Sequence, residues 1–125
     1  GLTGRLRISA ATTFARLHIV PRLPAFMEEH PGLDLELIMD DRVIDMVEEG
    51  VDVALRMGAL PDSSATARKL AAGRRLLVAT PAYLAHAGTP ANPAEIAGHQ
   101  AVVYTRYEAA HWTFRHAGGA EASVS

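Results

Sequence analysis

Two adjacent threonines, Thr12 and Thr13, are the first residues of the sequence whose type and position favour ligand chemistry. They follow the segment 5–11, which alternates like a strand before turning to small residues, and they precede a segment with helical spacing. Hydroxyls and unpaired backbone N–H groups meet at such a junction, where they suit a carboxylate or a similar anion. The alternative is that both threonines are ordinary helix caps.

An arginine at the end of another predicted strand is the next candidate. Arg56 follows the alternating segment 51–55 and precedes Met57 and Gly58. A guanidinium binds a carboxylate through two parallel hydrogen bonds, and the strand ends of α/β sheets are where small ligands are held. The alternative is an ion pair with one of three acidic residues: Asp40, Asp41 or Asp62.

A third candidate set lies at the end of the predicted strand 101–104 and consists of Tyr104, Thr105 and Arg106. Polar residues at the end of an apolar strand are suited to ligand contact. The alternative is an ordinary solvated surface loop.

Catalysis and metal binding find little support in the sequence. The six histidines are scattered, with no pair at metal-ligand spacing. The acidic pairs 40–41 and 48–49 are adjacent along the chain, which sends their side chains in different directions. The sequence contains no nucleophile elbow and no glycine-rich phosphate loop. It therefore predicts a binding domain that is not an enzyme and that needs no cofactor or metal.

The elements that must position these residues follow a strand–helix alternation in the first half of the chain. The predicted order is strand 5–11, helix 12–30, strand 33–40, helix 41–50 and strand 51–55. Pro21 and Pro24 lie inside the first helix and predict a kink or a restart, because proline lacks an N–H donor. This βαβαβ pattern implies parallel strands and right-handed crossovers.

Shorter elements are predicted in the rest of the chain, with a domain joint near Gly73. The strands are 66–70, 75–79, 101–104 and 111–115, and the helices are 81–86 and 93–97. Thr80 and Asn92 each precede a proline and are suited to cap these helices. Gly118 and Gly119 predict a hairpin turn into a returning strand.

Composition restricts the class of protein. The chain has 125 residues, 49% of them hydrophobic, which is sufficient for a packed core. Its net charge of −2, without a run of lysine or arginine, gives no electrostatic footprint for nucleic acid. There is no cysteine, and no segment approaches the roughly 20 apolar residues that span a bilayer. We expect a soluble, cytoplasmic protein.

Five phrases, in order along almost the whole chain, resemble the effector-binding domain of LysR-type transcriptional regulators. They are GRLRIS (4–9), PRLPAFMEEHP (21–31), DRVIDMVEEGVDVALRMG (41–58), LPDS (60–63) and ARKLAAGRRLLVATPAYLAHAG (67–88). The phrases are specific as a set, although none is diagnostic alone, and the resemblance is weakest after Tyr107.

The resemblance implies an α/β fold like that of periplasmic binding proteins, with Rossmann-type subdomains and mainly parallel sheet. Subdomain I is then expected over 1–73, and the start of an incomplete subdomain II over 74–125. A small effector, possibly a carboxylate, is expected in the cleft between them, contacting Thr12 and Thr13 from one side and 104–106 from the other. It further implies a winged helix-turn-helix DNA-binding domain before Gly1, absent from this chain.

The resemblance also implies a homodimer, in which the first helix and second strand of two effector domains pair antiparallel. The residues expected at that interface are Phe14, Leu17, His18, Leu23, Phe26, Leu35 and Leu37. The alternative is that these residues form an intramolecular core face, and both can hold for a helix that is apolar on more than one side.

The function predicted from these observations is sensing of a small, anionic metabolite by a LysR-type regulator. A solute-binding protein of a transport system has the same architecture and is the first alternative. A small α/β enzyme is the second, disfavoured by the absence of a nucleophile–base pair.

Overall fold

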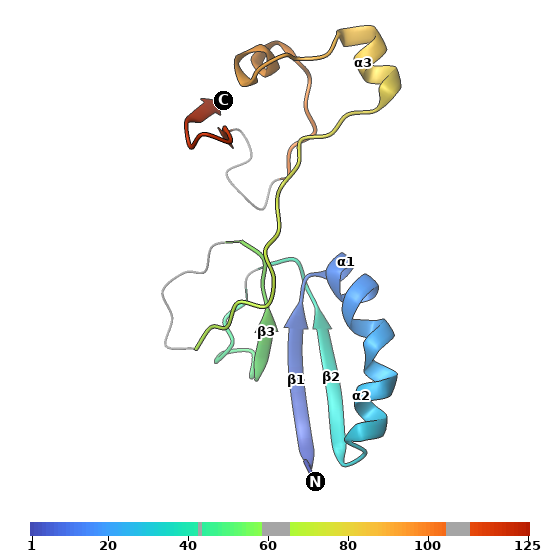
Figure 1. The fold of residues 1–125 in the computed structure, drawn as a ribbon. Helices are drawn as coiled ribbons and strands as arrows, with labels where there is room; N and C mark the ends of the chain where they lie inside the picture. Colours follow the sequence, from blue (N-terminus) through green and yellow to red (C-terminus); the bar gives the residue numbers. More distant parts are fainter. Residues whose placement is uncertain (43, 59–65, 105–110) are drawn as a thin grey trace. The chain divides into compact units, whose positions relative to one another are not determined.

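The computed structural model describes residues 1–42, 44–58, 66–104 and 111–125, which divide into two compact units, 1–66 and 67–125. The division falls after Thr66, a few residues before the joint expected at Gly73. Figure 1 shows both units as ribbons, and each is described by itself.

The first unit contains a three-stranded sheet in the order β2-β1-β3. Its strands are parallel, as the βαβαβ pattern predicts. The strands are β1 (Gly4–Ala10), β2 (Leu33–Met39) and β3 (Val53–Leu55). Asp52, directly before β3, is hydrogen-bonded to Arg7 of β1. Its carboxylate accepts the Arg7 N–H at 2.9 Å, and its own N–H donates to the Arg7 carbonyl at 3.0 Å.

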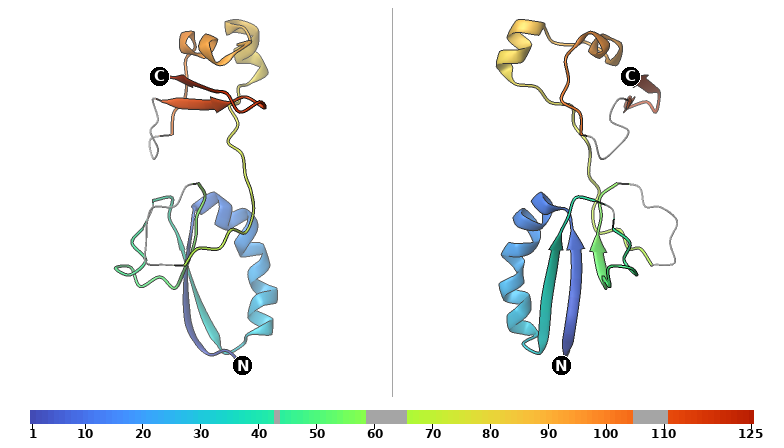
Figure 2. Two further views of the ribbon diagram at one scale, coloured as in Figure 1. Left: turned by 60° about the vertical axis from the view of Figure 1, so that its left-hand side comes forward. Right: turned by 180° about the vertical axis from the view of Figure 1, so that it is seen from behind.

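A broken helix joins β1 to β2 and lies along one side of the sheet (Figures 1 and 2). Its parts are α1 (Thr12–Phe14), the π-helix η1 (Ala15–Ile19), the 3₁₀-helix η2 (Val20–Arg22) and α2 (Leu23–Glu29). The change of helix type at Pro21 confirms the restart that the prolines predict.

The buried core of the first unit is made of small residues and one valine. Ala10 and Ala15 are 2% and 0% exposed, and Ser9 and Val51 are also buried. Ser9 and Ala10 end the central strand, and Ala15 lies one helical turn into the connection that follows. Small side chains here let the helix start close to the sheet, so that its first residues lie beside the strand ends.

The helix predicted over 41–50 is wrong for the residues that the structure describes there. Residues 46–50 form turns in its place. The Asp45 carboxylate accepts the N–H groups of Val47 and Glu48, both at 2.9 Å, and Gly50 ends the turns at φ +64°. Asp45 thus offers the backbone a local alternative to a longer helix.

The second unit contains α3 (Pro81–Ala87), the 3₁₀-helix η3 (Pro93–Gly98) and an antiparallel hairpin of β4 (Trp112–Arg115) and β5 (Glu121–Val124). The caps are as predicted, since Thr80 Oγ1 accepts the Tyr83 N–H and Asn92 Oδ1 accepts the Glu95 N–H. Tyr83 also ties α3 to the end of η3, with its hydroxyl 2.9 Å from His99 Nδ1.

Three predicted strands of the chain's second half do not form. Segments 66–70, 75–79 and 101–104 are non-regular and exposed. A strand requires a neighbour to satisfy its backbone N–H and C=O groups, and the described residues pair none with these segments. These segments therefore have the apolar pattern of strands in the sequence but form no hydrogen-bonded β-ladder with the described residues.

Candidate functional site

The register of the first sheet brings three strand ends into line. Ala10, the last residue of β1, pairs with Met39 of β2 on one side and with Leu55 of β3 on the other. Met39 and Leu55 are also the last residues of their strands. Because the strands are parallel, the residues that follow all three leave the sheet at one edge, the usual ligand site of α/β sheets (Figure 1). We call this the strand-end edge of the first unit: residues 11–13, 40–42 and 56–58.

Thr12 and Thr13 are exposed at this edge, as the first two residues of α1. Neither is the helix cap, because Ala11 holds that position without a side-chain hydrogen bond. The reading of these threonines as ordinary caps is therefore wrong. Within the described residues, neither hydroxyl takes part in a hydrogen bond, and both remain available to a ligand.

The backbone of Thr12 already binds a carboxylate. Its N–H donates to Asp41 Oδ1 at 2.8 Å, across the edge from the loop that follows β2. Asp41 thus supplies the acceptor for a helix start that has no cap of its own, and its negative charge lies where helix dipoles favour anions. The sequence analysis placed residue 41 at the start of the predicted helix 41–50 and did not predict this contact.

The neighbouring Asp40 is held by Arg42. The guanidinium donates to both carboxylate oxygens, from Nε at 3.1 Å and from Nη2 at 2.7 Å, and the Asp40 N–H donates to the Ala10 carbonyl at 3.0 Å. The hydrogen bonds, and next the attraction of the Asp40 charge, raise the pKa of Arg42 above its ordinary value. These bonds fix the loop that carries Asp41.

Arg56 is half-buried at the start of the loop after β3, where its Nη2 donates to the Ile44 carbonyl. Among described acidic residues, none forms an ion pair with Arg56, and Asp62 lies outside the described range. Met57 is 60% exposed, and Gly58 turns the chain at φ +90°. The ion pairs expected with Asp40 or Asp41 are thus not observed.

The structure therefore brings five of the predicted site residues to one edge: Thr12, Thr13, Arg56, Met57 and Gly58. Tyr104 belongs to the second unit and is 53% exposed. Thr105 and Arg106 lie outside the described residues. Over the described ranges, no group of three or more His, Asp or Glu could hold a metal ion, and no helix is long and apolar enough to cross a bilayer.

Comparison with known proteins identifies the family. The profile of the LysR substrate binding domain matches residues 1–123. The chain belongs to the LysR substrate-binding domain family. This domain is the effector-binding domain of LysR-type transcriptional regulators, so the resemblance seen in the sequence is confirmed, together with its α/β fold.

Relatives and solved structures agree with this assignment. An uncharacterized HTH-type transcriptional regulator of Haemophilus influenzae is 40% identical over 103 residues, which are 82% of this chain and 36% of the relative. The regulatory domain of CrgA, a LysR-type regulator from Neisseria meningitidis, aligns with a TM-score of 0.66 and 32% identity, over 94% of this chain and 58% of that one. A full-length AphB variant aligns with a TM-score of 0.75 and 33% identity, over 98% of this chain and 41% of that one.

This LysR-type chain thus spans little more than a third of the length of the Haemophilus influenzae relative. The relatives are regulators of transcription and not enzymes. The residues that the resemblance assigns to a dimer interface lie on the broken helix and on β2 in the first unit. Leu17 is 51% exposed and His18 is also exposed, whereas Phe14, Leu23, Phe26, Leu35 and Leu37 are half-buried.

Proposed function

We propose that this LysR-type domain senses a small, anionic metabolite through the strand-end edge of its first unit. The observation that carries the proposal is the 2.8 Å hydrogen bond from the Thr12 N–H to the Asp41 carboxylate. It supports the view that this N–H binds a carboxylate, and the exposed hydroxyls of Thr12 and Thr13 lie beside it. An anionic effector then replaces the Asp41 carboxylate as the acceptor of the Thr12 N–H.

Arg56 has the second role in the proposed site, at the rim. Its guanidinium keeps donors beyond the one used on the Ile44 carbonyl, and a carboxylate accepts two of them in parallel. Met57 and Gly58 follow Arg56, and Gly58 has no side chain that could obstruct the approach of a ligand. Tyr104, Thr105 and Arg106 are proposed to contact the effector from subdomain II.

At the level of the whole protein, we propose a regulator that binds DNA through a helix-turn-helix domain outside this chain. Subdomains I (1–73) and II (74–125) are proposed to close on the effector, which remains chemically unchanged. The effector controls transcription only to the extent that it binds one subdomain orientation more tightly than the other. A cytoplasmic location and the absence of catalysis follow from this role, which the regulatory relatives support.

The proposed dimer uses the broken helix and β2. Leu17, Val20 and Met27 are 51%, 43% and 50% exposed on this helix, so apolar surface remains for a second copy. Two half-buried members of the predicted interface, Phe14 and Phe26, make tilted ring contacts with His18 and His30, with ring centroids 5.2 and 4.7 Å apart.

Calorimetric titration tests the proposed site. The probe is the tightest-binding compound from a thermal-shift screen of small mono- and dicarboxylates, in which a binder raises the melting temperature. Thr12→Ala and Arg56→Ala are expected to weaken binding, and loss of a charge-assisted bond of about 1.5–3 kcal/mol corresponds to roughly a tenfold to hundredfold change for Arg56. Thr3→Ala and Arg16→Ala, at exposed positions elsewhere in the same unit, are the matched controls. Unchanged affinity in both site variants removes these residues from the site.

A further inference from the structure

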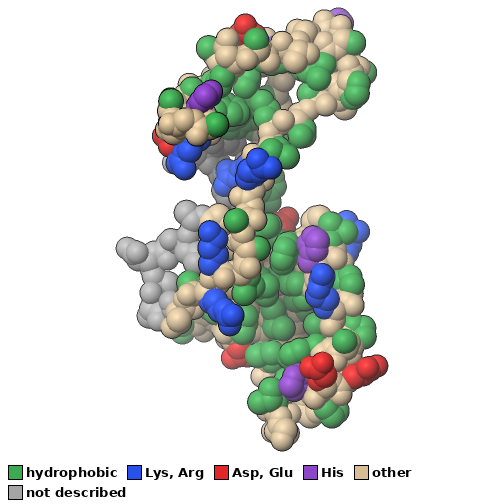
Figure 3. Space-filling view, viewed as in Figure 1, with side chains coloured by type: hydrophobic (Ala, Val, Ile, Leu, Met, Phe, Trp, Pro, Cys, Tyr) green, Lys and Arg blue, Asp and Glu red, His purple; other side chains and the backbone are tan. Residues whose placement is uncertain are grey.

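Two methionines accompany the polar groups of the strand-end edge. Met39 is the last residue of β2 and is 40% exposed, and Met57, in the loop after β3, is 60% exposed. The buried residues of the first unit, as far as the structure describes them, include no methionine. Hydrophobic side chains are accordingly part of the surface of this unit in Figure 3. The edge therefore offers a ligand apolar surface as well as hydrogen-bond donors.

The sheet register places the two methionines on opposite sides of the central strand. Met39 pairs with Ala10 from β2, and Met57 lies two residues beyond Leu55, which pairs with Ala10 from β3. Thr12 likewise lies two residues beyond Ala10. Neighbouring strands are about 4.8 Å apart, and a methionine side chain has three rotatable bonds with which to turn toward a ligand. A ligand bound at the Thr12 N–H is thus within reach of a methionine on either side.

The charges at the edge favour a ligand with a single negative group. Asp40 and Arg42 neutralise each other through their paired hydrogen bonds. Among the described acidic residues none forms an ion pair with Arg56, so this guanidinium is the positive charge left for an effector. The Asp41 carboxylate remains nearby after an effector has replaced it at Thr12, and it repels a second negative group.

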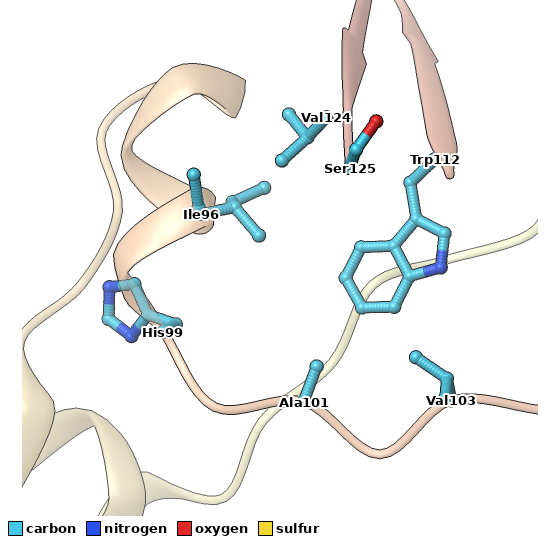
Figure 4. Close-up of a pocket in the computed structure, with 8 residues that line it drawn as sticks. Ile96, His99, Ala101, Val103, Trp112, Val124 and Ser125 are labelled. Carbon is cyan, nitrogen blue, oxygen red and sulfur yellow. The ribbon is translucent and has the colours of Figure 1, made fainter. Parts of the chain in front are cut away.

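An apolar hollow in the second unit lacks this combination of groups (Figure 4). It has a volume of about 190 Å³ and mainly apolar walls, with the Trp112 ring on one side. Its polar lining residues, His99 and Ser125, each hydrogen-bond a side chain of the protein, at 2.9 and 2.8 Å. Among the described residues, no lysine or arginine lines it. A carboxylate therefore finds no counterpart there to the Thr12 N–H and Arg56.

We propose that the effector is a monocarboxylic acid with an apolar body about the size of one aromatic ring. Its carboxylate binds the Thr12 N–H, and its apolar body contacts Met39 and Met57. Methionine suits this role, because its flexible thioether adapts to irregular apolar shapes and contacts aromatic rings favourably. Hydrophilic dicarboxylic and hydroxy acids bind less tightly, since they bring polar groups against apolar side chains. This inference rests on the proposed function, which supplies the carboxylate site.

Spectra of the methionine methyl groups, recorded during titration with phenylacetate, acetate or succinate, test this proposal. The chain has four methionines, and Met27, 50% exposed on α2, is the internal control. We expect the ring current of phenylacetate to shift the signals of Met39 and Met57 saturably and to leave that of Met27 in place. Phenylacetate is expected to bind at least roughly tenfold more tightly than acetate, because its ring leaves water. Succinate that binds more tightly than phenylacetate overturns the proposal, as do unshifted signals of Met39 and Met57 at saturation.

Glutamine variants localise the effect, because glutamine resembles methionine in length but is polar. Met39→Gln and Met57→Gln are each expected to lower the ratio of phenylacetate to acetate affinity by roughly twofold to tenfold. Met27→Gln, the matched control, is expected to preserve the ratio. An unchanged ratio in both edge variants overturns the proposal. If acetate affinity falls in Thr12→Ala while phenylacetate binds no more tightly than acetate, this inference fails and the proposed function stands. If no probe responds to Thr12→Ala, both fail.

Discussion

Replacing Asp41 with alanine is expected to move stability and ligand affinity in opposite directions. The substitution removes the carboxylate that accepts the Thr12 N–H at 2.8 Å, and Ala11 offers no side-chain cap in its place. Loss of such an acceptor costs about 1 kcal/mol. For a unit of 66 residues, this corresponds to a melting temperature lower by about 4 to 8 °C, measured by circular dichroism.

The same substitution leaves the Thr12 N–H without its internal competitor. An anionic effector no longer has to displace a bond of about 1 kcal/mol, so its affinity is expected to rise roughly fivefold. Removal of a like charge from the edge acts in the same direction. Calorimetric titration of the carboxylate probe against wild type and Asp41→Ala measures the change.

Asp45→Ala is the matched control for this prediction. Asp45 also accepts backbone N–H groups, from Val47 and Glu48, but it lies in the turns before β3 and not at the Thr12 junction. It is expected to lower stability by a similar amount and to leave affinity unchanged. An affinity that falls or stays constant in Asp41→Ala refutes the proposed exchange between effector and Asp41.

Three further predictions concern the fold and the interfaces. Gly32→Ala is expected to destabilise the first unit by about 1–3 kcal/mol in urea, because the new Cβ meets the Leu2 carbonyl oxygen at 2.8 Å. Leu17→Glu is expected to weaken self-association in sedimentation experiments while stability stays within about 0.5 kcal/mol, since Leu17 is 51% exposed. Tyr83→Phe is expected to cost about 1 kcal/mol of stability in thermal unfolding by removing the hydrogen bond to His99.

The elements that local patterns specify were predictable from the sequence. The alternation in β1 and β2 reflects a sheet with one face on the helix, and Pro21 marks the change of helix type. Thr80 and Asn92 cap the following helices through contacts only three residues long. Each of these signals acts over a single turn or a few residues, which is the range in which one sequence is informative.

The features that sequence reasoning missed depend on partners far along the chain. The bond from Thr12 to Asp41 spans 29 residues, and two adjacent aspartates after a strand do not reveal which donor each will find. Turns form in place of the helix expected over 41–50, because the Asp45 carboxylate accepts the N–H groups of Val47 and Glu48. The spacing of apolar residues does not reveal such side-chain bonds to the backbone. Segments 75–79 and 101–104 have the pattern of strands, but a strand forms only where another strand pairs with it.

Binding of an unaltered anion at the strand-end edge is tested most directly by backbone amide spectra recorded during titration with the carboxylate probe. We predict that the amide resonances of Thr12 and Thr13 shift saturably, with the binding constant found by calorimetry, and that the probe is recovered chemically intact. Saturable binding that leaves both resonances in place, or recovery of a modified compound, contradicts a sensing site at this edge.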